Sequence, residues 1–324
     1  MSVGKDVVTY LAENEWLNEN AKRWGTKIGA RAITAGTTLT ELIPVIQKLN
    51  YAGVRTSIVY LGDGLYEKAG ALEVKEQYIQ LIHLIQEKAL DATITLQLTQ
   101  LGLDIDFEFC YENVKEIVAE AYAYDVQVTI EMEDYGHVQP SFRMLEQLKE
   151  AYDNVGTVIQ AYFYRAEEDI KKYKDVPIRL VKGAYDEPIS VAYQTKEEIH
   201  DNYKKLLLEQ LQNGIFTSIA THDRDIIEEV KRFVQEQEIP FDAFEFQLLY
   251  GFDEELQEQL VGEGYPCSVY VPYGEEWYSY FMNRLAERPQ NITKKVFNKK
   301  TNTILATVAG AFVLGNLIGR RKKK

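Results

Sequence analysis

The chain has 324 residues, a length that suits one large barrel or two modest domains. Its formal net charge is −14 although residues 320–324 are all basic, so the rest of the chain is more acidic still. A body this acidic lacks the clustered cations that phosphate neutralisation needs, which excludes nucleic acid from the expected partners. Two cysteines, Cys110 and Cys267, and a start without an apolar signal region indicate a reducing, cytoplasmic location.

The first part of the chain is predicted to be helical. Apolar residues recur near the helical period over 6–35, and the pattern breaks at 35–38. A second helix is expected over Leu39–Leu49, with Thr38 or Thr40 as its cap and residues 50–53 as its end.

Short β-rich runs then alternate with amphipathic helical patterns. Strands are expected at 54–61, 92–98, 126–132, 156–162, 178–183, 216–221, 243–249 and 268–271. Helices are expected at 66–90, 107–124, 140–152, 165–174, 195–213, 224–237 and 253–263, with a last one near 275–287. Eight strands, each followed by a helix, predict an α/β protein with a (β/α)8 TIM-type barrel.

An open doubly wound sheet is the alternative fold. Such a sheet usually carries a glycine-rich turn after its first strand. The two candidate turns, at 62–64 and 262–264, each lack the third glycine of that motif. We therefore expect three regions: an N-terminal helical arm over 1–40, the barrel over 41–300, and an apolar tail over 301–324.

The tail differs from the rest of the chain. Residues 301–319 carry no charge and are just long enough to span a bilayer core as a helix. Small residues recur there every four positions, at Thr307, Ala311, Gly315 and Gly319. A docked terminal helix, a shallow anchor and a full span stay open as interpretations, so the tail is a candidate membrane contact or tail anchor.

The stretch from Arg179 to Tyr185, Arg-Leu-Val-Lys-Gly-Ala-Tyr, is the most informative part of the sequence. It begins as a buried strand and ends with two cations, a glycine and a tyrosine. Two solvated charges at a surface strand end are one interpretation. A Schiff-base lysine at Lys182 is another, because such lysines lie at the ends of barrel strands.

Polar residues recur where the predicted strands end, which is where a barrel carries its chemistry. They include Gln97, Thr99, Glu131, Glu133, Gln160, Arg179, Lys182, Thr221, His222, Gln247 and Tyr270. Their mixture of cations, amides and a histidine fits a phosphate-bearing cofactor with a heteroaromatic ring. His222 is the one histidine expected to act, with a buried structural histidine as the alternative. No metal-binding motif occurs in the sequence, so no metal centre is expected.

Five segments resemble the monofunctional, FAD-dependent proline dehydrogenases. They are 156–162, 179–185, 220–223, 244–247 and 270–274. The resemblance covers about residues 10–290 and implies a (β/α)8 barrel. It also implies hydride transfer from L-proline, or a related cyclic amino acid, to flavin N5 of FAD, with a membrane quinone as the electron acceptor.

The resemblance also assigns individual residues. It implies flavin contacts at Met132, Gln160, Arg179, Lys182, Gly183, Ala184, Thr221 and His222. Arg179 and Glu131 are the catalytic candidates, with Arg179 beside N5. It implies substrate contacts at Gln97, Tyr185, Leu249, Tyr270, Tyr280, Asn283 and Arg284.

Three of these positions depart from the family pattern. Gln97 stands where the family has a lysine, Glu131 where it has an aspartate, and Asn283 where it has the first of two arginines. Two cations that would hold the substrate carboxylate are thus neutral amides, which could cost about 2–3 kcal/mol of binding. A flavin-binding paralogue with altered substrate or lost activity is therefore the alternative function, and a Schiff-base lyase using Lys182 is the third.

Overall fold

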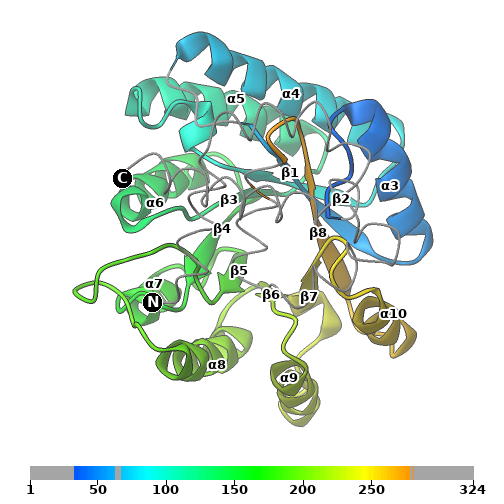
Figure 1. Cartoon of the computed structure of the whole chain (residues 1–324), viewed down its shortest axis with the longest axis vertical. Coiled ribbons are helices and arrows are strands. Elements are labelled where there is room, and N and C mark those ends of the chain that lie inside the picture. Colours follow the sequence, from blue (N-terminus) through cyan, green and yellow to red (C-terminus); the bar gives the residue numbers. More distant parts are fainter. Residues whose placement is uncertain (1–32, 63–66, 278–279, 281–324) are drawn as a thin grey trace, which may run out of the picture. The chain divides into compact units, whose positions relative to one another are not determined.

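The computed structural model describes residues 33–62, 67–277 and 280. Eight parallel strands in chain order close into a barrel, with β1 pairing with both β2 and β8 (Figure 1). The strands are β1 Arg55–Tyr60, β2 Ala92–Leu96, β3 Val128–Ile130, β4 Val155–Gln160, β5 Ile178–Val181, β6 Thr217–Ala220, β7 Phe244–Leu249 and β8 Cys267–Tyr273. This confirms the predicted (β/α)8 fold.

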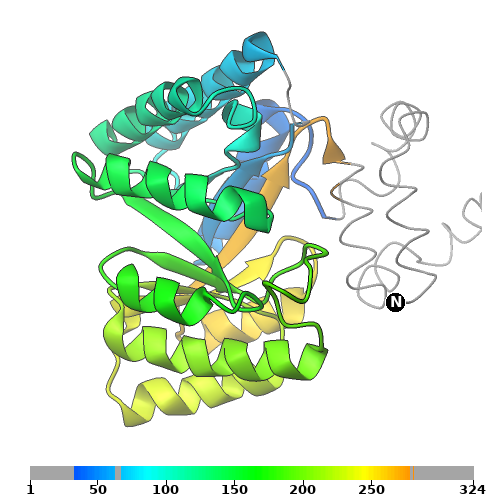
Figure 2. The same cartoon turned by 90° about the vertical axis from the view of Figure 1, so that its left-hand side faces the viewer.

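The helices surround this ring of strands (Figures 1 and 2). They are α3 Leu39–Tyr51, α4 Lys68–Glu87, α5 Phe107–Ala123, α6 Tyr135–Lys149, α7 Ala166–Lys172, α8 Lys196–Asn213, α9 Arg224–Glu236 and α10 Glu254–Gly262, with short 3₁₀ turns η3 Thr99–Leu101 and η4 Phe241–Ala243. In several helices the residue before the first turn is an N-cap, whose side chain accepts a hydrogen bond from a first-turn N–H. Such an N–H has no partner within the helix itself. Thr195 and Glu198 form a reciprocal capping box at the start of α8.

The predicted elements match the observed ones except at one clear boundary. The helix after the third strand was expected over 140–152. Helix α6 instead begins at Tyr135, since the Asp134 carboxylate accepts the N–H of Gly136 and caps it earlier. Pro140 lies inside the helix.

Side chains alternate along each strand between an outer and an inner face. Outward residues such as Ile58, Ile94 and Leu180 are fully buried and form the core between barrel and helices. The inner face of several strands carries polar side chains, including Ser57, Thr95, Glu131, Arg179, Ser218, Glu245, Gln247 and Ser268. A barrel interior is more usually filled by branched apolar residues, so this interior is specialised.

The chain divides into two compact units, one over Thr34–Glu276 and one made of 1–33 with 277–324. The first unit holds the barrel. Most of the predicted arm, the last predicted helix and the tail fall outside the residues that the structure describes. Within the described part of the chain, no helix is both long and apolar enough for a membrane crossing.

Candidate functional site

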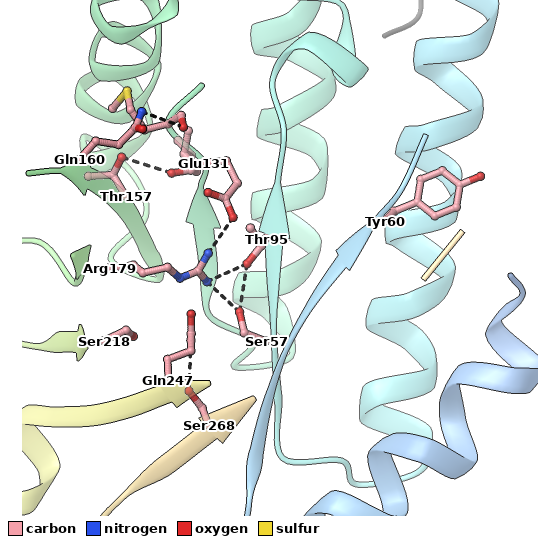
Figure 3. Close-up of polar contacts among 12 residues, drawn as sticks. Ser57, Tyr60, Thr95, Glu131, Thr157, Gln160, Arg179, Ser218, Gln247 and Ser268 are labelled. Carbon is pink, nitrogen blue, oxygen red and sulfur yellow. Dashed lines mark hydrogen bonds and ion pairs between the residues drawn. The ribbon is translucent and has the colours of Figure 1, made fainter. Parts of the chain in front are cut away.

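Arg179 of β5 is the centre of a buried hydrogen-bond network inside the barrel (Figure 3). Its Nη1 donates to Glu131 Oε1 at 2.8 Å, and its Nη2 donates to Ser57 Oγ at 2.8 Å and to Thr95 Oγ1 at 2.9 Å. These acceptors come from β1, from β2 and from the end of β3, so the guanidinium reaches across the barrel. Arg179 is 5% exposed, which rules out the interpretation of a solvated charge.

The Arg179 guanidinium can still interact with a ligand through its Nε–H group and through its planar face. Arg179 Nε is buried and has no hydrogen-bond partner among the described residues. The Tyr270 ring, from β8, lies over the guanidinium with 5.2 Å between Arg179 Cζ and the ring centroid. This arrangement can hold an electron-rich group beside a fixed positive charge.

The segment after β3 is held in place by hydrogen bonds from Gln160 and Thr99. Gln160 Nε2, from β4, donates to the carbonyl of Met132 at 3.2 Å and to that of Glu133 at 2.7 Å. The Glu133 carboxylate accepts the N–H and the hydroxyl of Thr99 at 3.1 and 2.7 Å. Burial raises the pKa of Glu133, and the two bonds from Thr99 oppose that rise. Because its nitrogen is used, the Gln160 amide can offer only its oxygen to a ligand.

Lys182, directly after β5, lies in a cluster of charged side chains. Its Nζ is 3.4 Å from Asp223 Oδ2 and 3.2 Å from His200 Nδ1. Burial raises the pKa of Asp223, but Lys182, the N–H of Ile226 and His200 together bring it below its usual value. The sequence did not point to His200, since a histidine inside a helical pattern carries no local signal.

Position 183 requires glycine because of its backbone conformation and because a side chain would have no room there. Its φ is +103°, in the region that favours glycine, and a side chain there would overlap the Tyr162 ring. The chain therefore passes close to Tyr162 before it reaches Ala184 and Tyr185, both of which are exposed.

The ends of β6 and β7 meet at His222. The N–H of Leu249 donates to His222 Nε2 at 3.0 Å, so this nitrogen is an acceptor and carries no proton. The Thr221 hydroxyl accepts the N–H of Asp223 at 3.1 Å and orders the turn into α9. His222 thus acts as a structural acceptor at the mouth, whatever else it contacts.

Gln97, directly after β2, is half-buried at the same end of the barrel. Its Oε1 accepts from Gln100 Nε2 at 2.5 Å. The next strand brings Glu131 beside it, because the N–H of Glu131 donates to the Leu96 carbonyl at 2.9 Å. The departures predicted at positions 97 and 131 are therefore neighbours in space.

Most predicted site residues of the barrel unit lie at or after the carboxyl ends of strands, whereas Arg179 and Tyr270 lie within β5 and β8. Tyr270 was expected at a strand end, but β8 continues to Tyr273. Tyr280 belongs to the other compact unit, and Asn283 and Arg284 lie outside the described residues. Sequence reasoning missed Ser57 and Thr95 as partners of Arg179. The alternation of side chains along β1 and β2 was the available signal, since it places both on the inner face.

Metal chemistry finds no support in the described part of the chain. No group of three or more histidine, cysteine, aspartate or glutamate side chains there could hold a metal ion.

Comparisons with known proteins agree on one family. A family model described as proline dehydrogenase matches residues 42–294. Proline dehydrogenase 1 of Bacillus subtilis (strain 168) is 43% identical over 289 residues, which are 89% of this chain and 96% of that protein. Proline dehydrogenase of Deinococcus radiodurans is 35% identical over 294 residues, which are 89% of this chain and 94% of that protein. The crystal structure of proline utilization A from Bdellovibrio bacteriovorus matches with a TM-score of 0.76 at 22% identity, over 90% of this chain and 36% of that one, which supports the fold alone.

Proposed function

The chain belongs to the proline dehydrogenase family, and from this premise we propose that it oxidises L-proline to Δ1-pyrroline-5-carboxylate with FAD as the cofactor. In this reaction the ring carbon next to nitrogen loses a hydride, the ring nitrogen loses a proton, and a C=N bond forms. Bound FAD would supply the hydride acceptor at its N5 and would pass the two electrons on to a membrane quinone.

Four observations on the barrel mouth fit a flavin with a pyrophosphate. The buried Arg179 guanidinium can stabilise a ring that becomes negatively charged when reduced. The Gln160 amide leaves its oxygen for a ring N–H, because its nitrogen already donates to two carbonyls. Lys182 supplies a cation for the phosphate groups. Gly183, with a positive φ, lets the backbone approach Tyr162 without a clash. Met132, Ala184, Thr221 and His222 remain proposed contacts.

The substrate would lie between Arg179 and the aromatic residues of the mouth. Tyr270 packs on the Arg179 guanidinium, and Leu249 is held by His222, so both have fixed positions. Tyr185, Tyr280, Asn283 and Arg284 complete the proposed substrate set from the sequence. Glu131 would act through Arg179, whose orientation it fixes by an ion pair of 2.8 Å.

A flavin-binding relative with altered or lost turnover is the second candidate function. The observation that favours it is the neutral amide of Gln97 beside the Glu131 carboxylate, at the place where a substrate carboxylate would need a cation. A Schiff-base mechanism has less support, because the Lys182 ammonium donates to Asp223 and His200.

The absorption spectrum of the purified full-length protein tests the proposal directly. We expect a yellow protein whose flavin band bleaches when L-proline is added without oxygen and returns when a dye acceptor is added. Arg179→Lys should keep the flavin but bleach more slowly, because a lysine cannot make the same three hydrogen bonds. A yellow protein that L-proline never bleaches would favour the second candidate, and a colourless protein that cannot be loaded with FAD would contradict both.

A further inference from the structure

Three polar atoms from three parts of the chain meet just after the end of β5. Lys182 Nζ is 3.2 Å from Nδ1 of His200, in α8, and 3.4 Å from Oδ2 of Asp223, the N-cap of α9. His200 Nδ1 is itself 3.6 Å from the same Asp223 oxygen. The ammonium and the imidazole nitrogen are therefore two candidate partners for one carboxylate oxygen.

The short distance between Lys182 and His200 indicates where the protons lie. An ammonium has only donors, so the His200 nitrogen that meets it is an acceptor and carries no proton. Burial raises the pKa of the Asp223 carboxyl, but its neighbours, with Lys182 first, bring it below its usual value, so it is ionised at neutral pH. Lys182 thus donates to a neutral ring and to a carboxylate.

A proton on His200 Nδ1 would change all three contacts. Two donors 3.2 Å apart repel each other, so Lys182 could not keep its present place beside the ring. The imidazolium could take over the Asp223 oxygen, since Nδ1 is only 3.6 Å from it. The three side chains are 31–35% exposed, which leaves room for this exchange. Protonation of His200 would therefore release the Lys182 ammonium from Asp223.

The net charge of the cluster explains why an anion would favour this exchange. While His200 is neutral, the charges of Lys182 and Asp223 cancel, and the cluster offers a phosphate no net positive charge. When His200 is protonated, one positive charge remains and the ammonium can donate to phosphate oxygens. A phosphate bound at Lys182 therefore stabilises the protonated ring, and the protonated ring strengthens the binding of the phosphate.

Other charged side chains near His200 are exposed or already paired. On α8 itself, Lys196, Glu197 and Lys204 are three or four residues from His200 and share its side of the helix. Lys196 and Glu197 are exposed, so solvent screens them. Lys204 forms an ion pair of 2.6 Å with Glu229 of α9. Among the described residues, the charged groups that form a hydrogen bond or ion pair with His200 are Lys182 and Asp223.

We infer that His200 is a positioning residue for the phosphates of the cofactor: it takes up a proton when the pyrophosphate binds, pairs with Asp223 and releases Lys182 to the phosphate. The proton comes from solvent, and no covalent bond of the cofactor changes. The inference rests on the proposed function for the identity of the ligand, FAD. It goes beyond that function because it predicts that FAD binds more tightly as the pH falls.

Calorimetry on the full chain stripped of flavin tests the inference without turnover. A free histidine titrates near about pH 6.5, so we expect the Kd for FAD to be about 10-fold lower at pH 6 than at pH 8. By linkage this corresponds to a net uptake of about 0.5 proton per FAD across the range, which titrations in two buffers of different ionisation enthalpy measure. Riboflavin has the same ring without phosphates, and its Kd should not change with pH.

Two variants separate His200 from its neighbours. His200→Gln cannot gain a charge, so FAD should bind with the same Kd at both pH values. His83→Gln is the matched control, because His83 pairs with the Glu120 carboxylate at 2.6 Å on α4 and α5, on the other side of the ring of strands from α8 (Figure 1). It should keep the full pH dependence. Lys182→Met should weaken FAD binding and remove its pH dependence, because no ammonium remains to be released.

An FAD affinity that is equal at pH 6 and pH 8, or a pH dependence that His200→Gln retains, would overturn the inference. A pH dependence that survives Lys182→Met would also overturn it, since the release of Lys182 would then play no part. The riboflavin comparison and the proton uptake use the wild type, so they decide the inference even if a variant does not fold.

Failure of the proposed function gives a different result. If the protein binds FAD at neither pH, the proposed function has failed, and ADP-ribose becomes the probe. ADP-ribose is a pyrophosphate diester without a flavin, and its pyrophosphate does not titrate in this range. An ADP-ribose affinity that falls from pH 6 to pH 8 and becomes constant in His200→Gln would support the role of His200. No binding, or binding that is independent of pH, would overturn it.

Discussion

The barrel interior holds two carboxylates, the partly buried Glu131 and the buried Glu245, in different ways. On one side, Glu131 accepts from the Arg179 guanidinium, which is also bonded to hydroxyls from β1 and β2. On the other side, Glu245 of β7 accepts from Ser218 Oγ at 2.7 Å and from Gln247 Nε2 at 3.2 Å. The first carboxylate has a cation as its hydrogen-bond partner, whereas among the described residues both hydrogen bonds to the second come from neutral groups.

The comparison suggests different roles for the two charges. The Glu131 charge holds the Arg179 cation in place, whereas the Glu245 charge has no cation among the described residues to hold by a hydrogen bond. An ion pair in a dry interior holds a cation in place at the cost of desolvating both groups. Glu245, at 7% exposure, has two neutral hydrogen-bond donors and only a longer-range attraction to the Arg55 cation. Gln247 also donates to Ser268 at 3.1 Å, so the Glu245 side is a chain of neutral hydrogen bonds. We expect the two sides to respond oppositely when their charge is removed.

The largest effect is expected when the cation is removed. Arg179→Met would leave the partly buried Glu131 carboxylate without its cation and the Ser57 and Thr95 hydroxyls without their donor, and breaking a buried pair costs about 3–5 kcal/mol. The free energy of unfolding, from urea titration, should fall by that amount. Arg143→Met is the control, because Arg143 forms a surface pair with Glu108 that should contribute about 1 kcal/mol or less. Equal losses in the two variants would contradict the proposed importance of the interior pair.

A matched pair of carboxylate variants compares the two sides directly. Glu131→Gln should destabilise the protein by about 3 kcal/mol, because it leaves the buried guanidinium uncompensated. Glu245→Gln keeps an amide oxygen for Ser218 and removes a buried charge, so its effect should stay within about 1 kcal/mol of zero. The same urea titrations measure both. A loss from Glu245→Gln as large as that from Glu131→Gln would remove the distinction between the two networks.

The smallest effect concerns Cys267, at the start of β8. Burial raises the pKa of its thiol to about 12, and the charge of Glu245 adds to that rise. A thiol in the unfolded chain ionises near pH 8.5, so this group's contribution to stability is present below that pH and is lost as the pH rises toward about 12. Glu245→Gln should lower the pKa of Cys267 modestly, since burial remains.

Ultraviolet absorbance of the thiolate, followed against pH, measures this shift. The titration is best done with Cys110→Ala, because Cys110 is also buried and its pKa is also raised. Identical curves with and without Glu245→Gln would show that Glu245 carries no charge close to Cys267.

The order of the elements was predictable from local pattern. Eight β-rich runs separated by amphipathic helices predicted the barrel, and the segment 179–185 led to the family that the comparisons confirm. Glu131 and Arg179 were both selected from the sequence as catalytic candidates, and the structure joins them in an ion pair. The early start of α6 was missed because the capping role of Asp134 was not recognised from the sequence.

The sequence by itself determined which side chains face inward, because residue alternation along a strand is a local property. Only the tertiary structure decided which of them meet. Arg179 finds Ser57 and Thr95 from strands 122 and 84 residues away, a pairing set by the register of a closed barrel. Gln100 likewise meets the Gly62 carbonyl only because β1 and β2 are neighbours in the closed barrel. The sequence specifies the charge and size of each side chain. Its hydrogen-bond partners depend on which groups the closed barrel brings together.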